Sequence, residues 1–416
     1  MSLLLKNCKL LSHGLPVIRD IYIKKGIIKR IGRLDIAADT VVNVKENFVI
    51  PGVIDSHVHF RGPGSDHKED WKTGSYAAAK GGVTTVLDMP NVPAVFTLKD
   101  LEEKKRKFAK KYSVVNYGFH FGSSAADNTA DIRNMEGIAS TKIYMNSTTG
   151  DLLITDLKLI EKIFRASKRI STHAEHKQVE EAVEIAKKTG KQLYLCHLSL
   201  KSEVDFLKKN KTSNIFCEVT PHHLFLTNKD FKKKKGFAFM RPNLKTAKDQ
   251  KALWDAIDYG LIDTIGTDHA PHAIEEKKAK KYPAGIPGIE TLLPLMLDAV
   301  NKKKITLQKL IEMTSRNPAA IFGIKNKGLL RVGYDADLTV IDMDLKQRVC
   351  NDELFTKCKW SVFDGKILKG WPIMTIVNGN IVFENGHVNN IKAREVTFGT
   401  MRHTRCARVG GVLGDA

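Results

Sequence analysis

Residues 48–60 read FVIPGVIDSHVHF, an apolar and β-branched run that ends on two histidines spaced two apart. Seven further runs of this kind precede residue 275, and each leads through a polar turn into a segment with helical spacing. Eight strands that alternate with helices predict an α/β fold, a (β/α)8 TIM barrel, with its reactive side chains at the carboxyl ends of the strands. The eight runs begin at Phe48, Val83, Tyr112, Ile138, Arg169, Gln192, Asn214 and Ile262.

The regions that flank these runs carry a different pattern. Residues 1–50 contain VIRDIYIKKGIIKRIG, and residues 328–395 contain GLLRVGYDADLTVID and TIVNGNIVFENGHV, which are strand and hairpin signals. Neither flank has enough strands for a core of its own. We therefore expect 1–50 and 328–395 to form one composite β domain beside a barrel at 51–327. Residues 397–416 lack periodicity and are expected to form a mobile tail that need not belong to the fold.

Composition and charge narrow the class of protein. Of the 416 residues, 42% are hydrophobic and 27% are charged, which excludes a disordered or fibrous chain. The net charge of +21 comes largely from lysine-rich helical segments, and the absence of zinc-finger spacing, an RNA-binding signature or a basic heptad argues against nucleic-acid binding. The six cysteines form no CxxC pair, and the first residues contain no long uncharged run. These features predict a cytoplasmic protein with reduced thiols and no membrane span.

Five side chains with metal-binding chemistry fall where predicted strands end. His57 and His59 are two residues apart, so both imidazoles point to the same side of their strand, into the barrel mouth. His173 and His197 end the fifth and sixth strands, and Asp268 ends the eighth. One histidine at a turn is usually structural, but five donors on one rim are hard to explain in that way. The pattern predicts a metal centre.

Lys142 lies in a strand, TKIYMNSTTG, that otherwise has a buried pattern, and it points toward the same rim. Metal cations would repel an ammonium there, whereas a carbamate formed with carbon dioxide is an anion that can bridge two cations. The alternative is a lysine that reaches past apolar neighbours to solvent. Two divalent ions, with zinc expected and cobalt or manganese also compatible with these donors, would activate a shared water for attack on an amide-like bond.

These motifs resemble those of a known family. DSHVHFRGPG from Asp55, the strand of Lys142, the single histidines of strands five and six, and GTDHAPH from Gly266 are similar to the amidohydrolase superfamily over about residues 1–395. The details resemble dihydroorotases in particular, although the superfamily motifs alone also fit a hydantoinase or an allantoinase. Three secondary marks favour dihydroorotases: Arg61 after HVHF, Asn91 at the end of DMPN, and His272 at the end of HAPH.

The resemblance implies a reaction and a role for each of these residues. The reaction is the reversible, zinc-dependent interconversion of N-carbamoyl-L-aspartate and L-dihydroorotate in pyrimidine biosynthesis. Asp268 would carry the proton, and YPAGIPG, residues 282–288, would turn backbone groups toward the substrate ring. The implied ligands are His57, His59 and Asp268 for one metal, His173 and His197 for the other, and carbamylated Lys142 for both. The implied substrate contacts are Arg61, Asn91 and His272, with Arg241 a further contact or a structural residue.

Several alternatives stay open on the sequence. A noncatalytic binding subunit of a pyrimidine-pathway complex is a candidate from another class, and the intact donor set argues against it. A homodimer and an association with aspartate transcarbamoylase are both open, although retention of Lys142 favours a self-sufficient site. Gly62 stands where many relatives have Glu, and we interpret His222 and His223 as structural or rim residues.

Overall fold

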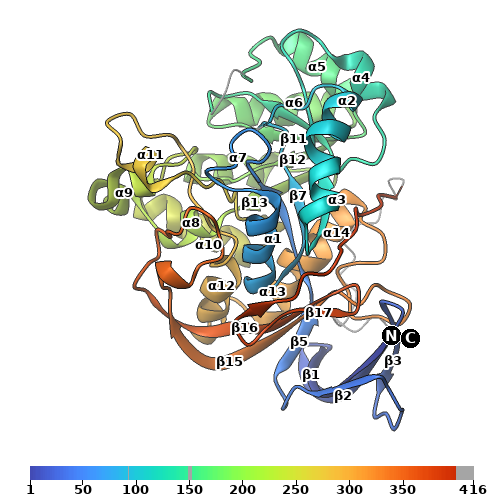
Figure 1. The fold of residues 1–416 in the computed structure, drawn as a ribbon. Helices are drawn as coiled ribbons and strands as arrows, with labels where there is room; N and C mark the ends of the chain where they lie inside the picture. The colour runs from blue at the N-terminus through green and yellow to red at the C-terminus, as the bar shows by residue number, and fades with distance from the viewer. Residues whose placement is uncertain (92, 149–151, 400–416) are drawn as a thin grey trace.

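The computed structural model describes residues 1–91, 93–148 and 152–399. Its centre is a set of short, buried parallel strands surrounded by helices (Figure 1). One parallel sheet has the order β6-β7-β8 and a second has the order β14-β13-β12-β11-β10-β9. The strands are β6 (Val53–Val58), β7 (Val83–Asp88), β8 (Asn116–Phe119), β9 (Phe121–Gly122), β10 (Thr141–Tyr144), β11 (Arg169–His173), β12 (Gln192–Leu195), β13 (Ile215–Val219) and β14 (Thr264–Ile265).

The two parallel sheets adjoin at both edges. Only His120 separates β8 from β9; its N–H donates to the Asp88 carbonyl of β7 at 2.9 Å, and the next N–H, of Phe121, donates to the Ser140 carbonyl beside β10 at 2.9 Å. At the other edge one parallel bridge joins Val58 of β6 to His269, which lies beyond β14. The predicted α/β class is confirmed, and its ladder bonds form two adjoining parallel sheets.

The helices cover these strands because each carries an apolar face. In α5 (Leu157–Ala166) the side chains of Ile160, Ile163 and Phe164 are buried, which is the spacing of one helical stripe. The carboxylate of Asp70 accepts the N–H of Thr73 and fixes the start of α1 (Trp71–Lys80). The other α-helices are α2 (Leu98–Leu101), α3 (Lys107–Tyr112), α4 (Thr129–Asn134), α6 (Lys177–Thr189), α7 (Lys201–Asn210), α8 (Pro221–Phe225), α9 (Asn228–Lys234), α10 (Ala247–Asp258), α11 (Ile274–Lys278), α12 (Leu292–Asn301), α13 (Leu307–Ile311) and α14 (Asn317–Phe322).

A mixed sheet combines strands from both ends of the chain, and in Figure 1 it lies below the helices. Its order is β18-β17-β16-β15-β5-β1-β2-β3, with β4 paired to β1, and the antiparallel pair β15 and β5 joins the C-terminal strands to the N-terminal ones. The strands are β1 (Ser2–Ser12), β2 (Leu15–Lys24), β3 (Ile27–Gly32), β4 (Thr40–Asn43), β5 (Phe48–Pro51), β15 (Leu338–Arg348), β16 (Ile367–Val377), β17 (Asn380–Glu384) and β18 (His387–Val388).

Residues 48–60, which the sequence presents as one run, contain two strands in different sheets. β5 belongs to the mixed sheet and β6 to a parallel sheet, and Gly52 lies between them. A Cβ atom at Gly52 would lie 2.1 Å from Oγ1 of Thr84, so a glycine is required where the chain passes from one sheet to the other.

A buried ion cluster joins the mixed sheet to the parallel strands. The ammonium of Lys327 pairs with the carboxylates of Asp335 and Asp337. Asp337 also accepts the side-chain N–H of Asn116, at the start of β8, at 3.0 Å and the backbone N–H of Asn378 at 2.7 Å. We call these five residues the Lys327 cluster. Every charge in it has an opposite charge beside it, which is the condition for keeping ions buried at a tolerable cost.

The last described residues are held against the rest of the chain. The N–H of Lys325 donates to the Thr397 carbonyl at 3.0 Å, that of Gly399 to the Gly323 carbonyl at 2.7 Å, and the Arg169 guanidinium to the Gly399 carbonyl at 2.9 Å. The backbone groups of 397–399 therefore have partners, and the mobile tail expected at 397–416 stays a prediction. The remainder of that expectation, 400–416, lies outside the described residues. Among the described helices, none combines the length and the apolar character needed to cross a membrane.

Candidate functional site

The six predicted metal donors gather at the carboxyl ends of the parallel strands. All six residues are buried, and the most exposed of them, Asp268, is 8% exposed. Parallel strands bring their carboxyl ends to one edge, and this is why residues far apart in sequence meet here. The donors are His57 in β6, His59 just after it, Lys142 in β10, His173 at the end of β11, His197 just after β12, and Asp268 just after β14.

Asp268 is the centre of the first group of donors. Its Oδ1 lies 2.8 Å from Nε2 of His59 and 3.3 Å from Nε2 of His57. Ligand atoms of His57, His197 and Asp268 all lie within 4.8 Å of one another. The backbone of Asp268 has φ of 48° and that of His197 has φ of 39°, both in the left-handed region that such residues seldom adopt. Strained backbone of this kind is typical of functional sites.

The hydrogen-bond directions around His57 leave a place for a cation. Its Nδ1 donates to Oε1 of Glu218 at 2.8 Å, so Nε2 presents a lone pair to the carboxylate of Asp268. His59 repeats the arrangement, because its Nδ1 donates to Oδ1 of Asn91 at 2.7 Å. Oδ1 of Asp268 lies within hydrogen-bond distance of Nε2 of His59 and 3.3 Å from Nε2 of His57, so one carboxylate oxygen and two imidazole nitrogens converge on one place. The donors present therefore fit a metal ion.

His173 and His197 form the second group. Nδ1 of His173 lies 2.9 Å from Nε2 of His197, and the ring centroids are 4.6 Å apart. Nε2 of His173 and Nδ1 of His197 are buried and have no hydrogen-bond partner. Buried polar atoms are rarely left without a partner, and a bound cation is one way to satisfy such nitrogens.

Electrostatics favour the metal-binding form of these imidazoles. Burial lowers the pKa of His57, His59 and His197 well below the usual histidine value, and it also lowers the pKa of His173. Neutral imidazole carries the lone pair that binds a metal. The four rings are therefore ready to ligate at neutral pH without first losing a proton.

Lys142 lies inside the site rather than at the surface. Its side chain is 1% exposed, and Nζ lies 2.9 Å from Sγ of Cys196 and 5.3 Å from the centroid of the Tyr144 ring. The alternative of a lysine that reaches solvent is wrong for this residue. No carboxylate pairs with Lys142 in the described part of the chain, as is expected of an amine whose charge is removed by modification.

The sequence did not single out the residues that support the donors. Glu218 in β13 is fully buried; besides His57 it accepts the N–H of His197 at 3.0 Å and the hydroxyl of Tyr194 at 2.7 Å. Burial raises its pKa to about 7. Atoms of His57, Cys196 and Glu218 also lie within 4.8 Å of one another. A carboxylate inside the apolar run IFCEV was the available signal, because a buried acid needs a reason.

A cavity beside Asp268 contains most of the predicted substrate residues. Arg61, Asn91 and Arg241 line it together with His59 and Asp268. Arg241 is exposed, and its guanidinium carbon lies 5.9 Å from the centroid of the Phe239 ring. Four further lining residues were not predicted singly: Thr148, Ala270, Ala284 and Gly285.

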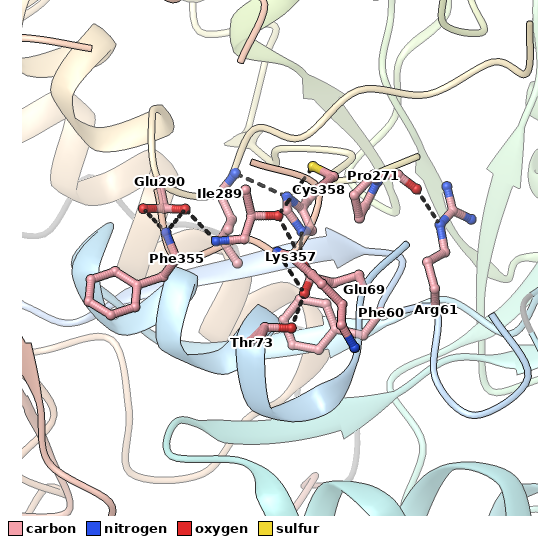
Figure 2. Close-up of polar contacts among 12 residues, drawn as sticks. Phe60, Arg61, Glu69, Thr73, Pro271, Ile289, Glu290, Phe355, Lys357 and Cys358 are labelled. Carbon is pink, nitrogen blue, oxygen red and sulfur yellow. Dashed lines mark hydrogen bonds and ion pairs between the residues drawn. The ribbon is translucent and has the colours of Figure 1, made fainter. Parts of the chain in front are cut away.

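Arg61 is a buried cation without a carboxylate partner. It is 2% exposed, and its Nε donates to the carbonyl of Pro271 at 3.2 Å (Figure 2). Burial lowers its pKa to about 10, so it stays charged at neutral pH. None of the ion pairs among the described residues includes Arg61. A guanidinium in this position is suited to a carboxylate of a ligand.

His272 lies behind the cavity wall rather than in it. Its Nε2 donates to the carbonyl of Ala284 at 3.0 Å, and its Nδ1 accepts from Nζ of Lys68 at 3.2 Å. Nε2 is also 3.4 Å from the guanidinium of Arg61. His272 therefore contacts the wall beside Ala284, and the substrate contact that the resemblance implied stays a prediction.

The remaining histidine and glycine expectations have structural explanations. His223 is buried between Thr220 Oγ1, at 2.8 Å, and the Pro242 carbonyl, at 3.1 Å, as expected of a structural residue. Its neighbour His222 is buried with Nε2 unpartnered. At Gly62 a Cβ atom would lie 2.6 Å from Oδ1 of Asp66, so a larger residue needs the Asp66 side chain to move.

Comparisons with known proteins agree with this site. The model of the amidohydrolase family matches residues 48–382. A dihydroorotase of Methanosphaera stadtmanae is 38% identical over 93% of this chain and 97% of its own, and one of Pyrococcus furiosus is 36% identical over 88% and 89%. The chain therefore belongs to the amidohydrolase family. Within that family its curated relatives, including one from Halobacterium salinarum at 33% identity over 91% of this chain and 99% of its own, are dihydroorotases, as the sequence motifs predicted.

Solved structures show the same fold in neighbouring enzymes. The L-hydantoinase of Arthrobacter aurescens superposes with a TM-score of 0.90 at 28% identity, over 95% of this chain and 99% of its own. The D-hydantoinase of a Thermus species has a TM-score of 0.85 at 26% identity, over 94% and 97%. Fold similarity thus extends to hydantoinases, whereas the higher sequence identities are to dihydroorotases.

Proposed function

We propose that the protein is a metal-dependent dihydroorotase that interconverts N-carbamoyl-L-aspartate and L-dihydroorotate. The observation that carries the choice of substrate is Arg61, a buried guanidinium without a carboxylate partner in the cavity that also contains Asp268. Dihydroorotate has a carboxylate on its ring, whereas hydantoin and allantoin rings have none. The 33–38% identity to curated dihydroorotases supports the same choice.

The proposed architecture follows from the strand arrangement. We take the two adjoining parallel sheets as the wall of a (β/α)8 barrel over about residues 51–327, with 1–50 and 328–395 as a composite β domain. The bridge between Val58 and His269 and the hydrogen bonds on either side of His120 support a closed wall. The free cysteines of the described chain are consistent with a reducing compartment such as the cytoplasm.

The proposed centre holds two divalent ions, with zinc expected from the imidazole and carboxylate donors. His57, His59 and Asp268 would hold one ion, His173 and His197 the other, and a carbamate on Lys142 both. When bound, the ions would supply Lewis acidity at the scissile carbonyl and make a water acidic near neutral pH. The convergence of His57 and His59 on Asp268, and the nitrogens of His173 and His197 that form no hydrogen bond, support this assignment.

The chain's own residues carry the rest of the reaction. In ring opening, Asp268 takes the proton from the attacking water and delivers it to the departing ring nitrogen; ring closure reverses these transfers. Arg61 binds the substrate carboxylate as a bidentate fork, and the Asn91 amide offers a donor and an acceptor to the ureide. Because Asn91 also bonds His59, substrate orientation and the position of His59 are linked.

An assay of the purified protein on L-dihydroorotate, allantoin and a 5-substituted hydantoin tests the substrate. We expect turnover of dihydroorotate to exceed that of the two uncharged rings. The solved-structure likeness to hydantoinases makes hydantoin the competing substrate, and preferential turnover of hydantoin would overturn the proposal. Elemental analysis of the same sample is expected to give two divalent ions per chain.

The Lys142→Ala variant tests the bridging carbamate. We expect loss of bound metal and of turnover, with partial recovery in the presence of acetate or propionate, because a small carboxylate can replace the bridge. Lys168→Ala is the matched control, since Lys168 is an exposed lysine at the opposite end of the neighbouring strand β11, and it should retain metal and rate. Full metal content and rate in the Lys142 variant would exclude the binuclear assignment.

A further inference from the structure

The loop from Ala270 to Gly285 forms one wall of the cavity but has little regular structure of its own. Its only α-helix is α11, five residues long, and yet Ala270, Ala284 and Gly285 of this loop line the cavity beside Asp268. Backbone hydrogen bonds hold its two ends, from the N–H of Ala270 to the Ile286 carbonyl at 2.9 Å and from the N–H of Gly285 to the Phe239 carbonyl at 2.9 Å, and side chains hold the rest. The question is which side chain fixes the wall.

Lys277 is the buried residue that joins the parts of this wall. It is 1% exposed, and its Nζ donates to the carbonyls of Pro283 at 2.8 Å, Gly285 at 2.8 Å and Phe239 at 3.1 Å. Three N–H donors thus meet three acceptors. Two acceptors lie on the returning half of the loop, and the third lies two residues before Arg241, another lining residue.

The charge of Lys277 has no carboxylate partner, which distinguishes it from a stabilising ion pair. None of the ion pairs of the described residues includes it, and burial together with the nearby Arg61 lowers its pKa to about 7. Burying an ammonium on carbonyls alone is costly in stability. The hydrogen bonds of Lys277 fix the conformation of the loop, and this explains its buried position better than a contribution to stability does.

A second contact holds the other half of the loop. The indole N–H of Trp360 donates to the carbonyl of His272 at 2.8 Å, and the Trp360 ring centroid is 5.8 Å from Nζ of Lys277. The segment that leads to Trp360 is itself fixed, because Glu290 accepts the N–H groups of Phe355 and Thr356 and Glu69 accepts that of Lys357 (Figure 2). Trp360 and Lys277 therefore clamp the two halves of one loop.

We infer that Lys277 is a positioning residue that fixes the cavity wall formed by Ala284 and Gly285 through their segment's carbonyls, and that it sets how tightly the enzyme holds its cyclic substrate. Trp360 assists through the carbonyl of His272. The inference rests on the proposed function for its substrate. It leaves the metal donors and Asp268 untouched, so it predicts a change in substrate binding rather than in the chemical step.

The test compares Lys277→Met with Lys191→Met in the metal-loaded enzyme. Lys191 also donates to a backbone carbonyl, that of Ser167 at 2.8 Å, but at the opposite end of the strands. We expect Lys277→Met to raise KM for dihydroorotate about tenfold, with kcat within about twofold, because a wall that has lost these hydrogen bonds holds the ring less tightly. Lys277→Arg should recover part of the loss, and Lys191→Met should leave KM unchanged.

A second pair of variants and a hydrogen-exchange measurement also test the inference. If Lys277→Met does not fold, Trp360→Phe removes the indole N–H together with part of the ring and should raise KM about threefold, whereas Trp371→Phe, which makes the same truncation and loses a bond to the Leu368 carbonyl, should not. Hydrogen exchange at the amide of Gly285 should accelerate in the loop variants even if wild-type turnover of dihydroorotate fails, which separates this inference from the proposed function. An unchanged KM with unchanged exchange, or an equal effect in the control variants, would overturn it.

Discussion

Two buried polar groups in this molecule differ in how the hydrogen-bonding and charged atoms of their side chains are paired. In the Lys327 cluster the ammonium meets two carboxylates, and amide groups complete the contacts of Asp337. At the rim of the parallel strands, Nε2 of His57 and Nε2 of His59 both face one oxygen of Asp268, and Nε2 of His173 and Nδ1 of His197 form no hydrogen bond. The buried Lys327 cluster therefore contributes to stability, whereas the buried rim residues are suited to ligand binding.

This difference predicts that the two groups respond separately to substitution. Changes at the rim should reduce activity with little loss of folding stability, because the apoprotein gains little from atoms that are not satisfied. Changes in the Lys327 cluster should do the reverse. A rim variant that mainly loses stability, or a Lys327-cluster variant that mainly loses activity, would contradict the comparison.

Asp268→Asn should give the largest effect of the series. The amide cannot take a proton from water, so we expect kcat to fall by about three orders of magnitude, with most of the metal retained by the other donors. The measurement is kcat with elemental analysis, beside the unfolding midpoint. Asp263→Asn, at the other end of the same strand run, is the control and should keep its rate. A near-normal rate for Asp268→Asn would exclude its role as proton carrier.

Lys327→Met should have its main effect on folding. Removal of the ammonium leaves the carboxylates of Asp335 and Asp337 buried together, and breaking a buried pair in this way costs about 3–5 kcal/mol. Urea unfolding of the variant should show this loss, while kcat per folded molecule stays unchanged. Lys357→Met removes a more exposed pair with Asp70 and should cost about 1 kcal/mol or less. A loss of metal in Lys327→Met would contradict the separation of the two groups.

The sequence predicted the metal donors at the rim better than the residues that support them, such as Glu218, and the reason is physical. His57, His173 and Asp268 end β-type runs, and strand geometry alone brings such ends to one edge. Glu218 could not be placed in the same way, because its partner His57 is 161 positions away and only the folded chain shows which strand carries the second carboxylate. The role of His272 stays a prediction, because a loop has no period that tells which side chains face a cavity.

The parts of the fold that were not predicted depend on close approaches in three dimensions. The run 48–60 divides into two strands because the backbone at Gly52 passes against Thr84, a contact that pattern alone does not reveal. Similarly, residues 397–399 are ordered by carbonyl and amide groups of 323–325 and by Arg169. Amino-acid periodicity indicates which side of a helix or strand is buried, but it does not indicate tertiary contacts of this kind.

Glu218→Gln would sharpen the comparison. The carboxylate of Glu218 has its own hydrogen-bond partners, and it orients His57, which belongs to the rim group. Loss of its charge weakens the orientation of His57, and outer partners of this kind typically change metal affinity or activity by about 10–100-fold. Metal dissociation constants and kcat measure the effect. Glu203→Gln is matched in burial, but its acceptors meet the backbone N–H groups of His176, Ser199 and Leu200, so its metal affinity should not change. Equal losses in the two variants would make the effect one of general destabilisation.

Asp20→Asn should give the smallest effect of the series. It tests how much an ion pair of the mixed sheet contributes to stability. Burial opposes ionisation of Asp20, but hydrogen bonds from the N–H groups of Leu34 and Asn7 and from Lys6 hold its pKa below the usual value. A lowered pKa in the folded state contributes stability above the unfolded pKa of about 3.9, and that stability is lost as the pH falls through the folded value. We expect the variant to lose about 1 kcal/mol at pH 7, with the difference from wild type shrinking below about pH 4. Urea unfolding at several pH values measures it, with Asp344→Asn at an exposed pair as control. A difference independent of pH would mean that Asp20 acts through packing rather than through its charge.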